Sequence, residues 1–158
     1  MAYAKGTAVS AGQSENEIKA TLRRYGATSF ASFESETHAM VAFEIEGRRI
    51  IFKLPLPDRT DREFTHRRVN ASSFAPRAPA DVLRVWSQAC NERWRALLLC
   101  IKAKLESVES GIETFEDAFL AHIQLPDGHT VSEHVRPGIA TAYKTGNMPP
   151  LLPGPSSN

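Results

Sequence analysis

The sequence predicts an α+β domain: an N-terminal helix, a three-stranded antiparallel sheet, a long helix packed across it and a small C-terminal helical region. Two apolar runs alternate on either side of a two-residue turn at Glu46-Gly47, which indicates a hairpin. A stretch of helical periodicity from about residue 79 to 108 contains no glycine after its start and no proline after Pro79, which indicates one long helix. The 158 residues, 42% of them apolar, suffice for one packed domain.

The boundaries of this domain follow from composition. Residues 1–13 are small and polar, which predicts a flexible N-terminus. We place the single domain at residues 14–146, followed by a proline-rich tail over residues 147–158. Ser14 and Glu17 fit the S-x-x-E capping box, so the first helix is expected to start there and to end before Gly26.

The sheet is expected to use residues 28–35 as its first strand and the hairpin around Glu46-Gly47 as the other two. With that turn, Phe43 lies opposite Ile50, and Val41 lies opposite Phe52. This register places six apolar side chains on one face, which identifies it as the core face. They are Val41, Phe43, Ile45, Ile50, Phe52 and Leu54.

Residues 56–79 show no periodicity and are interpreted as a long basic loop, an uncommon feature that is usually functional or disordered.

On the long helix that follows, Trp86 falls on the apolar stripe and is expected in the core. Trp94, between Arg93 and Arg95, is expected at the rim of an interface. Both cysteines, Cys90 and Cys100, are interpreted as small buried thiols.

Residues 111–146 are predicted to form an acidic helical subdomain. Thr114 with Asp117 and Thr130 with Glu133 are two further capping boxes, each of which opens a helix. Pro137 is expected to interrupt or restart the last helix.

Charge is separated along the chain although the formal net charge is only +1. Residues 48–77 contain eight basic and three acidic residues, a net charge of +5. Residues 105–135 contain seven acidic residues and no lysine or arginine. Either the two groups pair with each other, or each faces a different partner.

The basic group predicts a non-specific nucleic-acid interface, because the planar arginine fork binds phosphate oxygens in pairs. The alternative is a solvated polar loop with incidental arginines. The predicted nucleic-acid-binding residues are Arg48, Arg49, Arg59, Arg62, His66, Arg67, Arg68 and Arg77.

The acidic group predicts a protein-interaction surface, and therefore a second function as an inhibitor or adaptor of a host factor. Its carboxylates also sit near predicted helix starts, where the helix dipole favours negative charge without any partner. The predicted protein-interaction residues are Glu113, Glu116, Asp117 and Glu133.

The histidines of this region raise a third possibility, a metal-dependent enzyme using His129, Glu133 and His134. The string lacks the H-E-x-x-H spacing of zinc proteases, and five residues correspond to about 500° of helical rotation, so the two imidazoles are not expected to share a face. No nucleophile motif or phosphate-binding glycine loop is present. We therefore expect a non-catalytic protein with no metal site, no cofactor and no catalytic residue.

The start of the chain lacks the pattern of a secretory signal, and its longest apolar run is far shorter than a membrane span. This predicts a cytoplasmic protein without a membrane partner. The expected partners are nucleic acid, a host or phage protein, or a second copy of the chain.

Four strings, "RRYGATSFASFE", "RRIIFKLPLP", "WRALLLCIKAKLESVESGIETFEDAFLAHIQLPDGHTV" and "TGNMPPLLP", resemble an uncharacterised family of small bacteriophage and prophage proteins. The resemblance covers most of residues 15–153. It implies a phage accessory protein made in a bacterial cytoplasm, but no activity and no functional residue.

Overall fold

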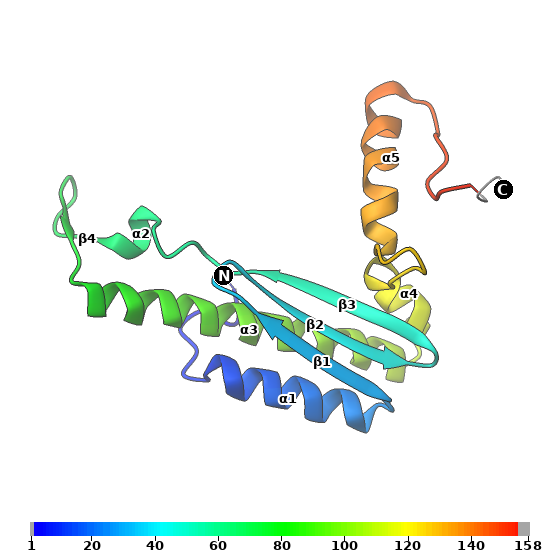
Figure 1. The fold of residues 1–158 in the computed structure, drawn as a ribbon, viewed down its shortest axis with the longest axis horizontal. Helices are drawn as coiled ribbons and strands as arrows, with labels where there is room; N and C mark the ends of the chain where they lie inside the picture. The colour runs from blue at the N-terminus through cyan, green and yellow to red at the C-terminus, as the bar shows by residue number, and fades with distance from the viewer. Residues whose placement is uncertain (1, 155–158) are drawn as a thin grey trace.

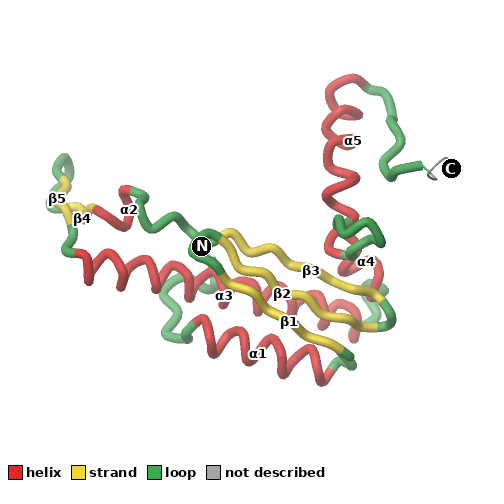
Figure 2. Tube along the Cα trace, viewed as in Figure 1, coloured by secondary structure: helices red, strands yellow, loops and turns green. Residues whose placement is uncertain are grey.

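The computed structural model describes residues 2–154 and has the predicted α+β architecture, drawn in Figures 1 and 2. A three-stranded sheet lies against α1 and a much longer helix, α3, while α5 stands away from the rest (Figure 1). The elements in chain order are α1 (Ala11–Arg24), β1 (Ser29–Glu34), β2 (His38–Ile45), β3 (Arg48–Pro55), α2 (Arg62–Thr65), β4 (His66–Arg68), β5 (Phe74–Pro76), α3 (Pro79–Glu109), α4 (Phe115–Phe119), the 3₁₀ helix η1 (Leu120–His122) and α5 (Val131–Thr145).

The sheet has the strand order β1-β2-β3, and the predicted hairpin register is confirmed: Phe43 pairs with Ile50, and Val41 pairs with Phe52. Glu46 and Gly47 both have positive φ, 52° and 72°, as a two-residue turn that matches the strand twist requires. Ile123 forms a bridge to Ile50, so the chain that follows η1 extends the sheet beyond β3.

The core lies between the sheet and the two helices α1 and α3. Ile18 of α1 and Ile101 of α3 are fully buried, and Trp94 is only 1% exposed. The expectation that Trp94 lies at the rim of an interface was wrong, since Trp94 is central. Trp86, expected in the core, is half-buried and packs against the edge of the core. The reason is the length of α3, whose N-terminal end extends beyond the sheet (Figure 1). Trp86 lies eight residues closer to that end than Trp94. Cys90 is buried as expected, whereas Cys100 is exposed.

The first helix starts earlier than predicted. Ser10 is its N-cap: the Ser10 hydroxyl accepts the backbone N–H of Gln13, and the Gln13 side chain accepts the N–H of Ser10. Glutamine closes a capping box as glutamate does, and Ser14 is instead buried within the helix. The segment expected to be flexible contacts α3, since the N–H of Ala11 donates to Asn91 Oδ1 at 2.8 Å. Met1 lies outside the described residues.

Residues 56–79 are not one irregular loop, because they contain α2 and a two-stranded antiparallel hairpin of β4 and β5. The strands are three residues each, too short to produce a readable alternation in sequence. We call residues 57–78 the arginine lobe. It lies at one end of the molecule, beside the N-terminal end of α3, and α5 rises near the other end (Figure 1).

The last helix is continuous through Pro137. Proline has no N–H, so the helix gives up one backbone hydrogen bond, and this is not enough to end it here. No residue of α5 is buried. The tail folds back on the helix, since a Cβ at Gly138 would lie 2.8 Å from Leu151 Cδ2. The predicted proline-rich tail is described through Gly154, and residues 155–158 lie outside the described residues.

Candidate functional site

The predicted nucleic-acid-binding residues fall into two groups at opposite ends of the molecule. Arg48 and Arg49 begin β3, next to the β2–β3 turn and close to the acidic C-terminal region. The other members belong to the arginine lobe (Figure 1). They are Arg59, Arg62, His66, Arg67, Arg68 and Arg77. The sequence therefore predicted one basic surface where the structure has two separate groups.

The group near the turn is engaged with acidic residues. Arg48 Nε lies 2.7 Å from Glu116 Oε1. Arg49 lies opposite Glu44 in the β2–β3 ladder, and within residues 2–154 it forms no ion pair. Lys53, further along β3, forms an ion pair with Glu133. The two ion pairs neutralise Arg48 and Lys53 within the monomer.

The predicted protein-interaction acids are held in internal contacts. Glu113 Oε2 accepts a hydrogen bond from Ser107 Oγ at 2.6 Å. Asp117 Oδ2 accepts one from Thr114 Oγ1 at 2.7 Å. Together with the Arg48–Glu116 pair, these bonds orient all three carboxylates around α4, and the ion pair balances the charge of Glu116.

Glu133 has the most strongly bound carboxylate of the group. Besides Lys53, it accepts the backbone N–H of Thr130 at 2.7 Å, which completes the predicted capping box of α5. The hydrogen bond from Lys53, followed by that from Thr130, lowers the pKa of Glu133 to about 2. Glu133 therefore fixes the start of α5 to β3 and is not a free ligand.

The arginine lobe is built on two aromatic contacts with the body of the protein. Phe64 of α2 is 5% exposed, in a lobe whose other side chains are half-buried or exposed. The indole N–H of Trp86 donates to the carbonyl oxygen of Pro57 at 2.7 Å. The backbone N–H of Arg77 donates to Thr65 O at 2.8 Å and closes the lobe where the chain enters α3. The hairpin is thereby held at a fixed place with its outer residues in solvent.

The outer residues of the lobe combine an exposed aromatic ring with arginines. Phe74 is 51% exposed, and the guanidinium carbon of Arg62 lies 5.0 Å from its ring centroid. Arg68 is the strand partner of Phe74, so the two side chains share a face of the hairpin. Two N–H groups of Arg68 donate to the carbonyls of Asn70 and Ala71, which orients its guanidinium.

The remaining basic residues of the lobe complete this surface. Arg67 is exposed on the opposite face of the hairpin, and the guanidinium carbon of Arg59 lies 5.9 Å from the Trp86 ring. His66 and Arg77 are half-buried. Between residues 2 and 154, none of the five lobe arginines forms an ion pair. Their charge is therefore available to an external anion.

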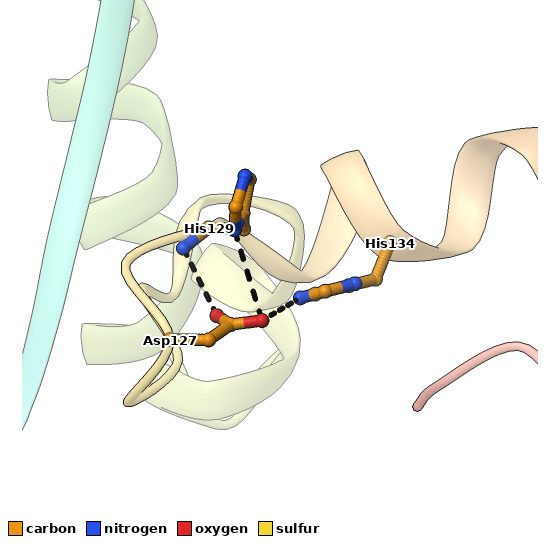
Figure 3. A group of neighbouring side chains, drawn as sticks. All are labelled: Asp127, His129 and His134. Atoms are coloured by element: carbon orange, nitrogen blue, oxygen red, sulfur yellow. Dashed lines mark hydrogen bonds and ion pairs between the residues drawn. The ribbon is translucent and has the colours of Figure 1, made fainter. Parts of the chain in front are cut away.

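The rings of His129 and His134 were expected to lie apart, and the structure contradicts this expectation. The rings of His129 and His134 approach to 5.4 Å between centroids, because His129 precedes the N-cap of α5 and its backbone is not helical. Asp127 lies between them (Figure 3). Glu133 does not take part, since its carboxylate contacts Lys53 and the backbone N–H of Thr130. We call Asp127, His129 and His134 the His–Asp cluster. The turn-forming Pro126-Asp127-Gly128 was the sequence signal that could have identified Asp127.

His122 is separate from this cluster. Its ring stacks on Phe52 at 4.0 Å between centroids, and burial lowers the pKa of His122, with a smaller contribution from Lys104. It therefore packs as a neutral aromatic side chain against the sheet.

Comparison with protein-family models, curated proteins and solved structures gives no match to the chain. None of the helices within residues 2–154 has the length and hydropathy to cross a bilayer. The function has to be inferred from the site itself.

Proposed function

We propose that this chain is a non-enzymatic phage or prophage accessory protein that binds nucleic acid non-specifically through the arginine lobe. The supporting observation is the group of Arg62 on α2 and Arg68 and Phe74 on the adjoining hairpin, where two arginines that form no ion pair within residues 2–154 flank a half-exposed ring. Proteins that bind single strands without sequence preference combine cationic side chains for phosphates with aromatic rings on which bases stack.

The lobe has a shape and a charge that suit this role. The stretch from Phe64 to Ala78 contains three arginines and no acidic residue. A two-stranded ribbon is narrow enough to enter the major groove of a duplex or to lie along a single strand. Arg48 and Arg49 are not part of the proposed interface, because they lie at the other end of the protein, where Arg48 is also paired with Glu116. The proposed setting is the cytoplasm of a bacterial host.

Fluorescence anisotropy with labelled single-stranded DNA, duplex DNA and single-stranded RNA, starting at low salt, tests the proposal. If Arg62, Arg67 and Arg68 each neutralise one phosphate, the logarithm of the association constant falls with the logarithm of salt concentration with a slope of about −2 to −3. Replacing these three arginines by glutamine is expected to abolish both the binding and its salt dependence. Absence of binding to all three probes at low salt would refute the proposal.

The aromatic ring has a matched control in the chain. Phe33 on β1 is 50% exposed, nearly the same as Phe74, but lies beside His38 instead of arginines. Phe74→Ala is expected to weaken single-strand binding by about 1–3 kcal/mol through lost stacking. Phe33→Ala is expected to leave affinity unchanged. Equal losses in the two variants would contradict the lobe as the binding surface.

A second candidate function is a protein-binding adaptor that uses the C-terminal region. Its support comes from α5, where no residue is buried and Ile139 and Tyr143 are exposed, together with the exposed Met148 of the tail that follows. A single helix of this length is marginal in water unless it packs on something. Apolar side chains, more than the internally bonded acids, would then contact the partner.

Co-purification from nuclease-treated host lysate tests this second candidate. Tyr143→Ser, which changes a side chain that is 92% exposed, should release a stoichiometric partner without affecting nucleic-acid affinity. Light scattering of the isolated protein distinguishes self-association from capture of another protein. A monomer that co-purifies with nothing, or with the same partner after Tyr143→Ser, would contradict it.

A further inference from the structure

The His–Asp cluster joins two segments that the sequence separates. Asp127 and His129 lie in the turn between η1 and α5, which is closed by a hydrogen bond from the N–H of Leu125 to the carbonyl of His129 at 2.8 Å. His134 lies in the first turns of α5. Figure 3 shows the Asp127 carboxylate between the two rings.

Asp127 is oriented by the backbone. Its Oδ1 accepts the N–H of His129 at 3.0 Å, so its Oδ2 is left to face both imidazoles. Oδ2 lies 2.6 Å from His134 Nε2 and 3.7 Å from His129 Nδ1. The hydrogen bond from the His129 backbone, with smaller contributions from both histidines, lowers the pKa of Asp127, so the carboxylate is ionised at neutral pH.

Two imidazole nitrogens and one carboxylate oxygen form the ligand set of many zinc sites. One ligand atom from each of the three side chains lies within 4.8 Å of the others. Zinc bonds of about 2.0–2.2 Å at tetrahedral angles place neighbouring ligand atoms about 3.3–3.6 Å apart. The pair of Asp127 and His134 needs to separate by less than ~1 Å to reach that distance, which side-chain rotation alone provides.

We propose that Asp127, His129 and His134 form a binding site for one divalent transition-metal ion of the zinc type. The fourth coordination position faces solvent, because Asp127 and His129 are exposed. Glu133 is not a ligand, since Lys53 and the Thr130 N–H hold its carboxylate elsewhere.

The position of the site gives the metal a mechanical role. The N–H of Gln124, just before the turn, donates to Arg49 O at 2.8 Å, so the turn is attached to β3. A metal bound by Asp127 and His129 on the turn and by His134 on the helix would fasten the start of α5 to the sheet. The ion would therefore reduce the motion of α5, which the rest of the protein contacts little. The site is independent of the arginine lobe.

Titration of the full, untagged chain with Co²⁺ and then Zn²⁺ tests the site. Cobalt is expected to produce visible absorption bands that saturate at one equivalent, and zinc is expected to displace it. Removing an outer-shell partner of a metal ligand typically costs 10–100-fold in affinity. His129→Ala, His134→Ala and Asp127→Asn should each weaken zinc binding at least that much, and asparagine retains the acceptor that forms the turn.

Two control variants test whether a loss of metal binding is specific to the three residues of the His–Asp cluster. His38→Ala removes an exposed histidine on β2, and Glu133→Gln removes the neighbouring carboxylate; both should keep the affinity of the unmodified chain. Circular dichroism verifies that each variant is folded. Absence of saturable cobalt binding, equal binding by the three cluster variants, or loss of binding on His38→Ala would overturn the assignment.

Discussion

The arginine lobe and the C-terminal region carry opposite charges in the sequence, and they use those charges differently. In the C-terminal region Glu116 and Glu133 form ion pairs with Arg48 and Lys53, so both partners are neutralised within one monomer. Between residues 2 and 154 the arginines of the lobe have no such partner. The difference teaches that the net charge of a segment does not show by itself how much of that charge is free, because ion pairs with distant segments can balance it.

The two regions also differ in how they are attached. Phe119 of α4 is fully buried and meets the Phe43 and Phe52 rings edge-on, which makes α4 part of the core. The lobe reaches the body through Phe64 and the hydrogen bond from Trp86. The C-terminal region therefore belongs to the cooperative unit at its α4 end, while the lobe is an attachment to α3.

The largest expected effect on stability tests whether the two regions are attached to the core to different degrees. Phe119→Ala should destabilise the whole protein by about 3–5 kcal/mol, as loss of a fully buried phenylalanine does. Phe64→Ala should instead loosen the lobe, so that amide exchange accelerates over residues 62–77 and the sheet stays protected. Urea unfolding and hydrogen exchange measure the two effects. If both variants lowered global stability equally, the lobe would be part of the core after all.

The next effect concerns pH and the C-terminal region. The folded-state pKa of Glu133 is about 2 against an ordinary value of 4.5, so its contribution is present above pH 4.5 and is lost as pH falls toward 2. Allowing for its partial exposure, Glu133→Gln should cost about 1 kcal/mol at pH 7 and flatten the stability profile over that range. Thermal unfolding between pH 2 and 7 measures it, with the exposed Glu36→Gln as control. Identical profiles for both variants would contradict the expectation.

A smaller effect tests the ion pair between the two oppositely charged segments. Arg48 and Glu116 have half-exposed side chains, so a double-mutant cycle with Arg48→Gln and Glu116→Gln should give a coupling of about 0.2–1 kcal/mol. Because the pair is solvent-accessible, 1 M salt should reduce the coupling. A coupling of zero at low salt would mean that Arg48 is as free as the lobe arginines.

The smallest effect is expected in the lobe itself. Arg62, Arg67 and Arg68 are exposed and make no ion pair within residues 2–154, so changing any one of them to glutamine should alter stability by no more than about 0.5 kcal/mol. Urea unfolding at low and high salt measures this. A loss of several kcal/mol would show that the arginines hold the lobe together and are not available to phosphate.

The sequence by itself determined the elements whose cause is local. The hairpin register follows from a turn in which Glu46 and Gly47 both take positive φ and from the alternation of apolar residues along β2. The length of α3 follows from helical periodicity without a breaker, and the start of α5 from the Thr130–Glu133 box. In each case the neighbours along the chain supply both the geometry and the hydrogen bonds.

Only the tertiary structure decided which residues meet across the chain. It placed Trp94 in the core and Trp86 near the lobe, because burial along α3 depends on where the sheet lies. It divided the basic residues between two ends and brought Asp127 between His129 and His134, through the path of a turn that periodicity does not encode. Ion pairs and metal-ligand sites depend on the distances between side chains from different elements. A sequence pattern shows only how residues are arranged along a single helix or strand.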